Sequence, residues 1–407
     1  MRILLSTIGS RGDVQPLLAL ALALRNLGHA VRFCTAPNFT RWLAEYGFPT
    51  HAVGPDLEQM AAMPPPQLAA PRPRPSAEFL QQLANDAVRR QFTELQVAAQ
   101  DCDLLIAANV VQYATHSIAE LLGVPYRFVA YSPDNFPSGA HPPPKMLDPH
   151  PHDMPAATNL QWWQEESVHW NQLFGATINE ERGKLGLAPI ADVKHYLFGE
   201  RPLLAADPVL APLPETTVKA VQHGAWLIDD TRPLPEAVER FLAAGPAPVY
   251  IGFGSMRTDP ALAQTMIAAA KALGRRVVLS SGWARLTTAE DADTLVLGDC
   301  NHSALFPRVA AIVHHGGAGT TTAAALAGTP QLLVPHNYDQ FWWARRIQQL
   351  GVGASVARDG LDTTLAQIAL HSVLTASMAM QAKALASRMV TNGAVLAAQQ
   401  CTGEDRQ

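Results

Sequence analysis

Residues 305–353 read LFPRVAAIVHHGGAGTTTAAALAGTPQLLVPHNYDQFWWARRIQQLGVG. Two short apolar runs within this stretch, residues 310–314 and 331–334, predict buried β-strands. Residues 320–326 and 339–350 follow the two runs and have the composition of helices. Strand and helix therefore alternate, which is the pattern of a parallel sheet covered by helices.

The same alternation extends through the chain in both directions. Residues 248–253 and 276–280 are expected strands that flank a helix over 260–273, so residues 221–407 form one α/β domain. The first half predicts a second sheet, with strands at 2–8, 30–35, 102–108 and 126–131 and helices at 14–27, 39–46 and 112–122. Asp13 and Gly28 are expected to cap the first of these helices. The sequence thus predicts two Rossmann-like, doubly wound domains that face each other across a cleft. The proline-dense residues 202–235 suggest a boundary near residue 220, so the first domain covers residues 1–220. The last helix of the second domain is expected to pack back on the first.

Composition excludes several classes of protein. The 407 residues are 48% hydrophobic and 16% charged, with 30 Lys and Arg against 35 Asp and Glu, a net charge of −5. No basic surface for nucleic acid is expected from this balance. The four cysteines lie far apart, which suits a reducing compartment. Because residues 2–8 begin the fold and the apolar run 17–24 is too short for a bilayer, we expect a cytoplasmic protein without signal peptide or membrane span.

Glycines follow the predicted strand 310–314. His315, Gly316, Gly317, Gly319 and Thr320 lie between this strand and the next helix. Free backbone N–H groups at a helix N-terminus, together with the helix dipole, favour a phosphate. His315 and Thr320 can each donate a further hydrogen bond. The alternative is a Gly-rich turn in which Thr320 caps the helix.

Asp339 and Gln340 follow the next strand, nineteen residues after Thr320. A carboxylate beside an amide suits a polyhydroxylated ligand, although Asp339 could also be an ordinary helix cap. The loop 252–255 follows the first strand of the second domain, and the loop 9–13 follows the first strand of the first domain. All four loops therefore lie at carboxyl ends of parallel strands, where open α/β sheets bind ligands. These loops predict a phosphate-bearing, sugar-like ligand on one wall of the cleft and a lone carboxylate, Asp13, on the other.

Neither half contains a G-x-G-x-x-G sequence between strand and helix, which argues against a nicotinamide dehydrogenase. Three further strings are GSRGDVQPLLALALALRNLGHAV (9–31), PVYIGFGSM (248–256) and VVLSSGWA (277–284). Together with residues 305–353, they resemble the inverting, nucleotide-sugar-dependent glycosyltransferases of the GT-B fold. The likeness is to bacterial antibiotic glycosyltransferases of the vancomycin type and to sterol glucosyltransferases. It covers residues 1–55 and 247–356 well and the middle poorly.

The resemblance implies roles for individual residues. Asp13 resembles the catalytic base of the family. The expected donor contacts are His315 and the loop Gly316, Gly317, Gly319 and Thr320 for the diphosphate, Ser255 as another phosphate contact, Asp339 and Gln340 for sugar hydroxyls, and Ser10, Arg11 and Trp283. Core packing is an equal explanation for Trp283. Where plant relatives stack a Trp on uracil, this chain has Asp299, so UDP and TDP donors both remain open. It also lacks their N-terminal His, which leaves Asp13 as the only base of its loop. We expect its position near a helix N-terminus to depress its pKa, and shielding within the closed cleft to raise its basicity.

The function implied is transfer of a hexose, glucose, from a UDP- or TDP-sugar to a hydroxyl of a hydrophobic small molecule. No cofactor and no metal are expected, because fixed dipoles replace a divalent cation. His141, His150 and His152 could suggest a metal, but a solvated loop is preferred because no carboxylate or Cys completes the set. The aromatic stretch with Trp162, Trp163 and Trp170, and the six prolines of residues 63–76, are expected to shape the acceptor pocket, with core packing as the alternative. A lipid acceptor would allow peripheral membrane contact. A UDP-sugar 2-epimerase and a non-catalytic nucleotide-sugar-binding protein are the alternative functions.

Overall fold

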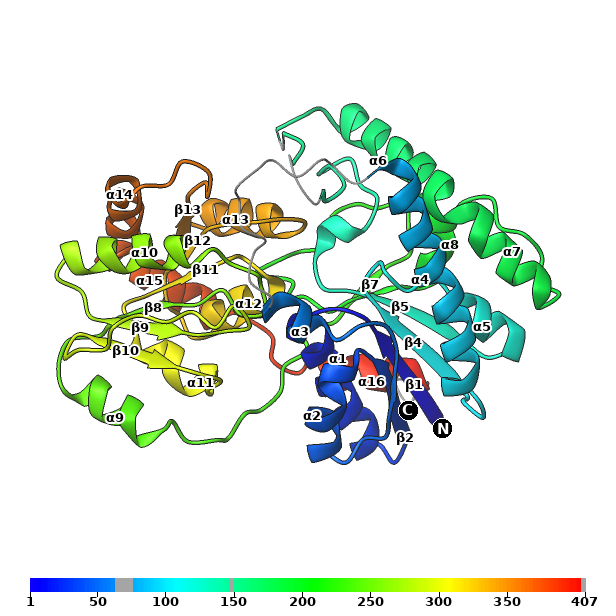
Figure 1. The fold of residues 1–407 in the computed structure, drawn as a ribbon, viewed down its shortest axis with the longest axis horizontal. Coiled ribbons are helices and arrows are strands. Elements are labelled where there is room, and N and C mark those ends of the chain that lie inside the picture. Colours follow the sequence, from blue (N-terminus) through cyan, green and yellow to red (C-terminus); the bar gives the residue numbers. More distant parts are fainter. Residues whose placement is uncertain (63–75, 146–148, 152, 404–407) are drawn as a thin grey trace.

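The computed structural model describes residues 1–62, 76–145, 149–151 and 153–403. It contains two α/β domains that lie side by side, each built on a parallel sheet (Figure 1). The predicted fold class is therefore confirmed. Of the proline-rich stretch at 63–76, all but Ser76 lies outside the described residues.

The first sheet belongs to the N-terminal domain. Its strands are β1 (Arg2–Thr7), β2 (Ala30–Thr35), β3 (Thr50–Ala52), β4 (Leu104–Ala108), β5 (Tyr126–Ala130), β6 (Leu203–Leu204) and β7 (Val221–Gln222). They are ordered β3-β2-β1-β4-β5-β6-β7. The helices are α1 (Arg11–Asn26), α2 (Thr40–Glu45), α3 (Leu57–Ala62), α4 (Ala77–Ala98), α5 (Thr115–Leu122), α6 (Ala156–Trp170), α7 (Ala176–Lys184) and α8 (Val193–Phe198), with short turns η1 (Pro37–Phe39), η2 (Pro133–Asn135) and η3 (Asn171–Gly175).

The second sheet forms the C-terminal domain. Its strands are β8 (Val249–Ile251), β9 (Val277–Ser280), β10 (Thr294–Leu297), β11 (Ala311–His314), β12 (Gln331–Leu333) and β13 (Gly353–Ser355). They are ordered β10-β9-β8-β11-β12-β13. The helices of this half are α9 (Glu236–Ala243), α10 (Pro260–Ala272), α11 (His302–Leu305), η4 (Phe306–Arg308), α12 (Ala318–Leu326), α13 (Gln340–Gln349), α14 (Thr363–Val373), α15 (Ala376–Ala386) and α16 (Gly393–Thr402).

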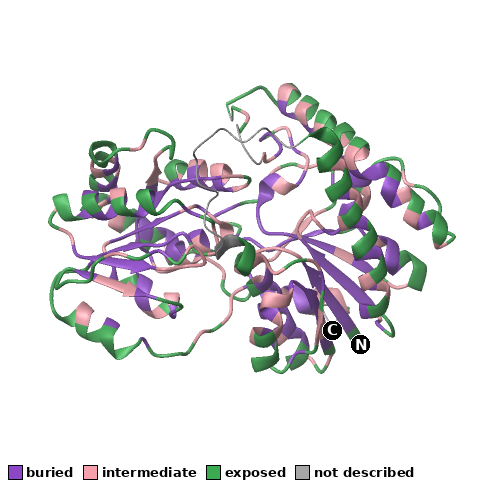
Figure 2. Cartoon of the chain, viewed as in Figure 1, coloured by how far each residue is buried: buried purple, intermediate pink, exposed green. Residues whose placement is uncertain are grey.

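Burial explains why the central strands read as apolar runs. The central strands of both sheets are buried along most of their length, and exposed residues lie on the outer faces of the helices (Figure 2). A strand covered by helices on both faces cannot alternate polar and apolar residues. In the first domain, α1, α2 and α16 cover one face of the sheet and α4 to α8 the other (Figure 1).

Helix α1 begins three residues before the predicted start at residue 14. Ser10, not Asp13, is the N-cap, and its hydroxyl accepts a hydrogen bond from the Gly12 N–H at 3.2 Å. Asp13 lies in the first turn, and its Oδ2 accepts a hydrogen bond from the Ser10 N–H at 2.6 Å. This reciprocal arrangement is a capping box, and it places the Asp13 carboxylate at the helix N-terminus immediately after β1.

The chain passes from the first domain to the second and returns to the first with its last helix. Strand β7 completes the first sheet, so the chain leaves that sheet after Gln222, two residues beyond the predicted boundary. Strands β6 and β7 both lie within residues 202–235, which the sequence presented as a connection. The last helix, α16, packs on α1 of the first domain, and the end of α16 lies near the N-terminus (Figure 1). Helix α1 also contacts α12 of the second domain.

Candidate active site

The first wall of the site is the loop between β1 and α1. Ser10 donates to Asp13 Oδ2 through its N–H at 2.6 Å and its hydroxyl at 3.1 Å. Tyr131 donates its hydroxyl to the Asp13 carbonyl at 2.6 Å. Ser10 thus orients the Asp13 carboxylate, and its assignment as a donor contact stays a prediction.

The expected depression of the Asp13 pKa is wrong. Desolvation raises the pKa of Asp13 above 3.8, although hydrogen bonds from Asn109 and Ser10 act in the opposite direction. Burial at the junction of two domains therefore outweighs the favourable helix N-terminus. A raised pKa makes this carboxylate a stronger base, which suits it to accept a proton from a hydroxyl group.

The second wall is the glycine-rich loop between β11 and α12. His314 is buried, its Nε2 lies 2.9 Å from Gln331 Oε1, and its Nδ1 accepts from the Gly316 N–H at 3.1 Å. This bonding makes Nδ1 the unprotonated nitrogen of a neutral ring. Gly316 has a φ of +92°, which requires glycine, and a Cβ there would lie 3.2 Å from the Gln340 carbonyl oxygen. His314 thus holds the turn, a role that the sequence reading did not assign to it.

His315 lies between two glycines that come from different loops. A Cβ on Gly317 would lie 2.5 Å from His315 Nε2, and one on Gly254 would lie 3.4 Å from His315 Cε1. Desolvation, with the neighbouring His314 and His336, lowers the pKa of His315 to about 3. The ring is therefore neutral near pH 7, and it can donate one N–H to an anion while the two glycines leave space beside it.

The N-terminus of helix α12 has no side-chain cap. Its N-cap is Gly317, which has no capping side chain, and Thr320 lies in the first turn. Thr320 is consequently not the helix cap, which was the alternative explanation of the loop. The N–H groups of Ala318, Gly319 and Thr320 begin the helix and have no intrahelical acceptor. They are the groups expected at a phosphate site.

Ser255 and Trp283 come from two loops that are joined to each other. The Trp283 N–H donates to the Gly254 carbonyl at 3.0 Å, and Ser255 is the next residue in that loop, half-buried. The Trp283 ring packs on Phe39 of the first domain, with centroids 5.9 Å apart. The indole therefore contributes to the packing between the domains, beside the loops that carry Ser255 and His315.

Asp339 and Gln340 differ in their surroundings. Gln340 is buried, and its Oε1 accepts from the N–H groups of His336 at 2.8 Å and Asn337 at 3.2 Å. Its amide nitrogen donates to Asn337 Oδ1 at 2.9 Å. Gln340 therefore fixes the loop that leads to Asp339. Asp339 is half-buried, and Trp343 donates its indole N–H to Asp339 Oδ2 at 3.1 Å.

Asp134 is a site residue that the sequence reading missed. It lies in η2 after β5, is 2% exposed, and burial raises its pKa to about 6. Burial also raises the pKa of Asp339, and the negative charges of Asp134 and Asp13 raise it further, to about 8. Three carboxylates from both domains therefore interact at the junction. The available signal was Ser132-Pro-Asp-Asn135 at the carboxyl end of a predicted strand.

Arg11 lies at the junction as part of an ion pair. Its Nη1 is 2.7 Å from Asp299 Oδ1, and its guanidinium carbon lies 4.9 Å from the centre of the Trp42 ring. Asp299 belongs to the C-terminal domain, at the position where the plant pattern has an aromatic residue. The structure places Arg11 against this carboxylate.

The histidines and tryptophans of the middle segment are mainly packing residues. His141 is 4% exposed, so the prediction of a solvated loop is wrong there, and its carbonyl accepts from Trp163 Nε1 at 3.1 Å. His150 stacks on Trp162, with ring centroids 3.9 Å apart, and His152 lies outside the described residues. Trp163 and Trp170 are buried. Within the part of the chain that the structure describes, no three His, Cys, Asp or Glu residues are grouped to hold a metal ion.

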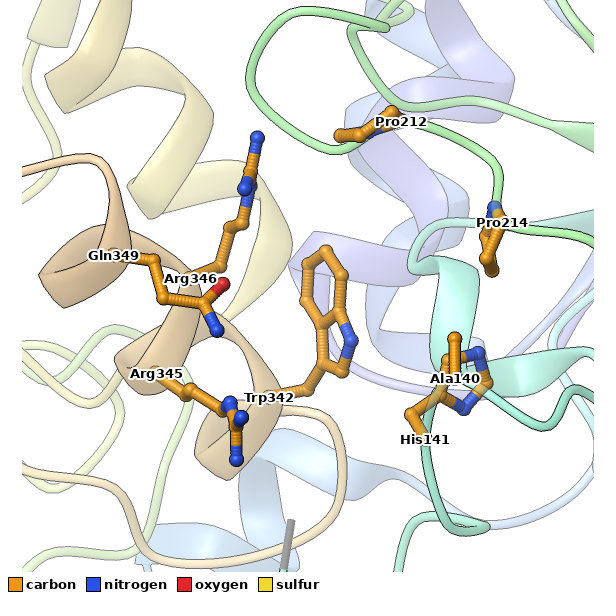
Figure 3. Close-up of a pocket in the computed structure, with 8 residues that line it drawn as sticks. All are labelled: Ala140, His141, Pro212, Pro214, Trp342, Arg345, Arg346 and Gln349. Carbon is orange, nitrogen blue, oxygen red and sulfur yellow. The ribbon is translucent and has the colours of Figure 1, made fainter. Parts of the chain in front are cut away.

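A cavity of about 170 Å³ lies between the domains along α13. The side chains of Trp342, Arg345 and Arg346 approach it from α13, and loop residues of the first domain approach it from the other side (Figure 3). Its lining comprises Ala140, His141, Pro212, Pro214, Trp342, Arg345, Arg346 and Gln349. Arg346 donates to the Leu210 carbonyl at 2.7 Å, so this guanidinium joins the two domains.

Helices α1 and α12 pack on each other, and Ala318, the first residue of α12, packs against the hydrophobic core that α1 helps to form. Asp13 lies in the first turn of one helix and the glycine loop in the first turn of the other. A base on one wall and an anion site on the other, at the carboxyl ends of two parallel sheets, define a two-domain transferase that acts on a phosphate-bearing donor.

Comparison with known proteins gives the same class. Residues 3–135 match the glycosyltransferase family 28 N-terminal domain, and residues 275–397 match the erythromycin biosynthesis protein CIII-like, C-terminal domain. The chain is 42% identical to vancomycin aglycone glucosyltransferase of Amycolatopsis orientalis, over 98% of this chain and 96% of the relative. It is 38% identical to dTDP-epi-vancosaminyltransferase of the same organism, over 95% and 92%.

More distant proteins extend the comparison. A sterol 3-beta-glucosyltransferase of Arabidopsis thaliana is 31% identical over 87% of this chain and 59% of its own length. The solved structure of glycosyltransferase VinC in complex with DTDP superposes with a TM-score of 0.69 at 20% identity, covering 99% of each chain. The chain belongs to the antibiotic-type GT-B glycosyltransferases, as the sequence motifs predicted. None of the helices in its described residues is long and apolar enough to cross a membrane.

Proposed function

We propose that this glycosyltransferase transfers a hexose from a UDP- or TDP-sugar to a hydroxyl of a hydrophobic small molecule. The proposed hexose is glucose, and its configuration at the anomeric carbon is inverted in the transfer. The observation that carries the proposal is the packing of α1 on α12, with the Asp13 carboxylate in the first turn of one helix and the anion site at the start of the other. A base and a leaving-group site on opposite walls favour a single displacement, because the acceptor oxygen and the diphosphate then occupy opposite sides of the anomeric carbon.

Asp13 is the proposed base. The acceptor oxygen forms a bond to the anomeric carbon, the bond from that carbon to the diphosphate oxygen breaks, and the acceptor proton passes to Asp13. An alcohol holds its proton far more tightly than a carboxyl group does, so the proton transfers late, as the new bond forms. The raised pKa of Asp13 reduces this mismatch. Phenols should be better acceptors than aliphatic alcohols, since their protons are more acidic.

The glycine loop is the proposed diphosphate site. The departing diphosphate gains negative charge, so the N–H groups at the start of α12 and the His315 ring stabilise the transition state more than the bound donor. These donors supply the electrostatic stabilisation that a divalent cation would otherwise provide. Ser255 lies in the loop that meets His315 at Gly254, which supports its assignment as a further phosphate contact.

Asp339 is the proposed sugar ligand, and Gln340 supports it by holding residues 336–337. A carboxyl with a raised pKa is protonated over part of the neutral range, so it can both donate to and accept from sugar hydroxyls. Such a site discriminates against a sugar that lacks the hydroxyl, because the buried polar group is then unpaired. This argument favours glucose, and the name of the 42% identical relative supports the same sugar.

The acceptor is proposed to bind on the first domain beside Asp13. Tyr113 stacks on Phe174 with ring centroids 4.5 Å apart, and Trp170 lies 5.0 Å from Phe174. The negative charge of Glu166, beside this cluster, acts on Tyr338 of the second domain. The cluster therefore lies close to the junction. These rings are buried, so they support the acceptor side of the site from beneath, and an apolar environment of this kind favours a flat hydrophobic aglycone over a charged one.

Mass spectrometry tests the proposed function directly. The protein is incubated with UDP-glucose, TDP-glucose or a TDP-deoxysugar and a panel of phenols and aliphatic alcohols. A hexose mass added to a phenol, with the β-linkage seen by NMR from an α-linked donor, supports the proposal. Preference for the deoxysugar would overturn the assignment of glucose. An α-linked product would overturn inversion, and the absence of any transfer would overturn the reaction and its acceptor class.

A further inference from the structure

Asn109 lies at the carboxyl end of β4, beside the strand that leads to Asp13. Its neighbour Ala108 pairs with Thr7 of β1, so Asn109 is the first residue beyond the paired region. Its backbone has a φ of +64°, in the left-handed region that Asn tolerates better than most residues. Its N–H nevertheless donates to the Val129 carbonyl at 3.0 Å. The chain therefore turns sharply here, and the side chain of Asn109 is directed to the β1–α1 loop.

Every polar group of the Asn109 amide has a partner. Its nitrogen donates to the Ile8 carbonyl at 2.9 Å and to Asp13 Oδ1 at 3.0 Å, and its oxygen accepts from the Val111 N–H at 3.1 Å. Rotating the amide by half a turn would set its oxygen against the Ile8 carbonyl and the Asp13 carboxylate. The three bonds thus allow one orientation, in which two N–H groups face the catalytic loop.

The two oxygens of Asp13 are used differently. Oδ2 accepts two hydrogen bonds from Ser10, through its N–H and its hydroxyl. Oδ1 accepts the bond from Asn109. A carboxylate oxygen has two lone pairs, so Oδ2 is saturated by these two donors while Oδ1 retains one for a substrate.

We propose that Asn109 is the positioning residue that holds Asp13 Oδ1 as the oxygen that receives the acceptor's proton. This inference rests on the proposed role of Asp13 as base. Ser10 donates to Oδ2 of the carboxylate and Asn109 donates to Oδ1, and together these bonds fix the rotation of the carboxylate about χ2. The remaining lone pair of Oδ1 then points in one direction, and the acceptor hydroxyl meets it without reorganisation of the site.

The chemistry explains why an amide serves here better than a carboxylate. An Asp at position 109 would bring a second negative charge to about 3.0 Å from Asp13 Oδ1. Two carboxylates at that distance share a proton, so the pKa of Asp13 would rise further. The neutral amide supplies a hydrogen bond without this penalty.

Two substitutions separate positioning from folding. Asn109→Gly keeps the left-handed backbone available and removes the amide. Asp101→Gly is the matched control, because Asp101 also has a positive φ, +60°, on the exposed surface. We expect Asn109→Gly to lower kcat by about 10- to 100-fold, the worth of one hydrogen bond to a charged group. Nucleoside diphosphate affinity, measured by calorimetry, should stay within twofold. Equal kcat losses in the two variants, or a loss of diphosphate affinity in Asn109→Gly, would overturn the proposal.

The pH profile gives a second readout, which a merely structural role would not move. In Asn109→Asp, the acidic limb of kcat/KM should shift to higher pH relative to the unmodified enzyme, because a like charge opposes ionisation of Asp13. An unchanged limb contradicts the proposal.

The Asp13→Asn variant distinguishes a failure of the proposed base from a failure of the proposed positioning role. If the unmodified enzyme transfers sugar and Asp13→Asn retains full activity, the assignment of the base is wrong, whereas an inactive Asp13→Asn with unaffected Asn109 variants rejects only the positioning role.

Discussion

Arg11 of the first domain and Asp299 of the second form an ion pair in which Nη1 and Oδ1 are 2.7 Å apart. The other oxygen of Asp299 lies 3.1 Å from Arg232, in the segment that joins the domains. The resemblance to the glycosyltransferases implied that Arg11 contacts the donor. In the structure its charge is matched by a carboxylate of the opposite domain, so Arg11 connects the two halves of the site.

This pairing predicts that Arg11→Gln and Asp299→Asn behave alike. The side chains are 35% and 50% exposed, so each variant should change the free energy of unfolding by less than about 1 kcal/mol. Both should leave affinity for nucleoside diphosphate within about threefold, as measured by calorimetry. Arg41→Gln, which breaks an exposed pair with Glu45, is the control. A tenfold loss of affinity confined to Arg11→Gln would instead establish direct contact between Arg11 and the donor.

The Asp13→Asn variant should lose most of its turnover while it retains the donor. The amide oxygen can still accept from Ser10, so the helix cap survives, but the side chain can no longer take a proton. We expect kcat to fall by about 10²- to 10⁴-fold, the usual contribution of general base catalysis. Rates come from product formation with a phenol and with an aliphatic alcohol. Asp101→Asn, on the exposed surface, is the control. Near-normal rates on the aliphatic alcohol would rule out Asp13 as the base.

His315 is expected to bind the diphosphate as a neutral hydrogen-bond donor. Because burial keeps its pKa at about 3 in the unliganded protein, the ring has no charge to lose between pH 6 and 8. His315→Ala removes a bond to a charged group and should weaken nucleoside diphosphate about 10- to 150-fold, equivalent to about 1.5–3 kcal/mol. His315→Gln retains an N–H donor and should recover part of the loss. Equal affinity of His315→Ala and the unmodified protein would show that this ring only packs.

Local patterns were sufficient to predict the central strands of both sheets and the glycine loop, whereas the strands β6, β7, β10 and β13 were not predicted. Residues 310–314 are apolar because helices cover both faces of β11, and the glycines after them are required by the φ of Gly316 and the ring of His315. The loops fall at carboxyl ends of parallel strands in any doubly wound sheet, so their convergence followed from topology.

Contacts between distant segments were beyond the reach of local patterns. Asp134 gains its importance only because Asp339, from the other domain, lies near it. Gln340 resembled a sugar ligand, yet its amide oxygen accepts hydrogen bonds from the backbone N–H groups of residues 336 and 337. The sequence indicated both effects on the pKa of Asp13, but only the structure shows that burial outweighs the helix N-terminus. Helix α4 was missed because its polar faces and the preceding prolines obscured its periodicity.

Gly317→Ala should damage donor binding more than folding. The added Cβ would lie 2.5 Å from His315 Nε2, so the imidazole must move away from the place where it meets the diphosphate. We expect weaker nucleoside diphosphate binding by calorimetry. Gly183→Ala is the control, since a Cβ there, in the last turn of α7, meets nothing within 4 Å. It should raise the free energy of unfolding by about 0.5–1 kcal/mol and leave binding unchanged. Unaltered binding in Gly317→Ala would contradict the proposed geometry of the loop.

Asp339 should make the protein less stable as the pH rises. Its pKa is about 8 in the folded protein, against 3.8 in an unfolded chain, so between these values the folded state holds a proton that the unfolded state has lost. The free energy of unfolding must therefore decrease as the pH increases from about 4 to about 8, and the decrease ends above pH 8. Asp134, whose pKa burial raises to about 6, acts with the same sign over a narrower range.

Asp339→Asn should remove part of this decrease, because its side chain cannot ionise but can still accept from the Trp343 indole. Urea unfolding at half-unit intervals from pH 5 to 9 measures the effect, with Asp359→Asn as the control on an 89% exposed side chain. We expect a shallower slope in Asp339→Asn and an unchanged slope in the control. Parallel slopes in all three proteins would mean that Asp339 is already ionised across this range. It could then only accept hydrogen bonds from sugar hydroxyls, and the preference for glucose would rest on fewer contacts than proposed.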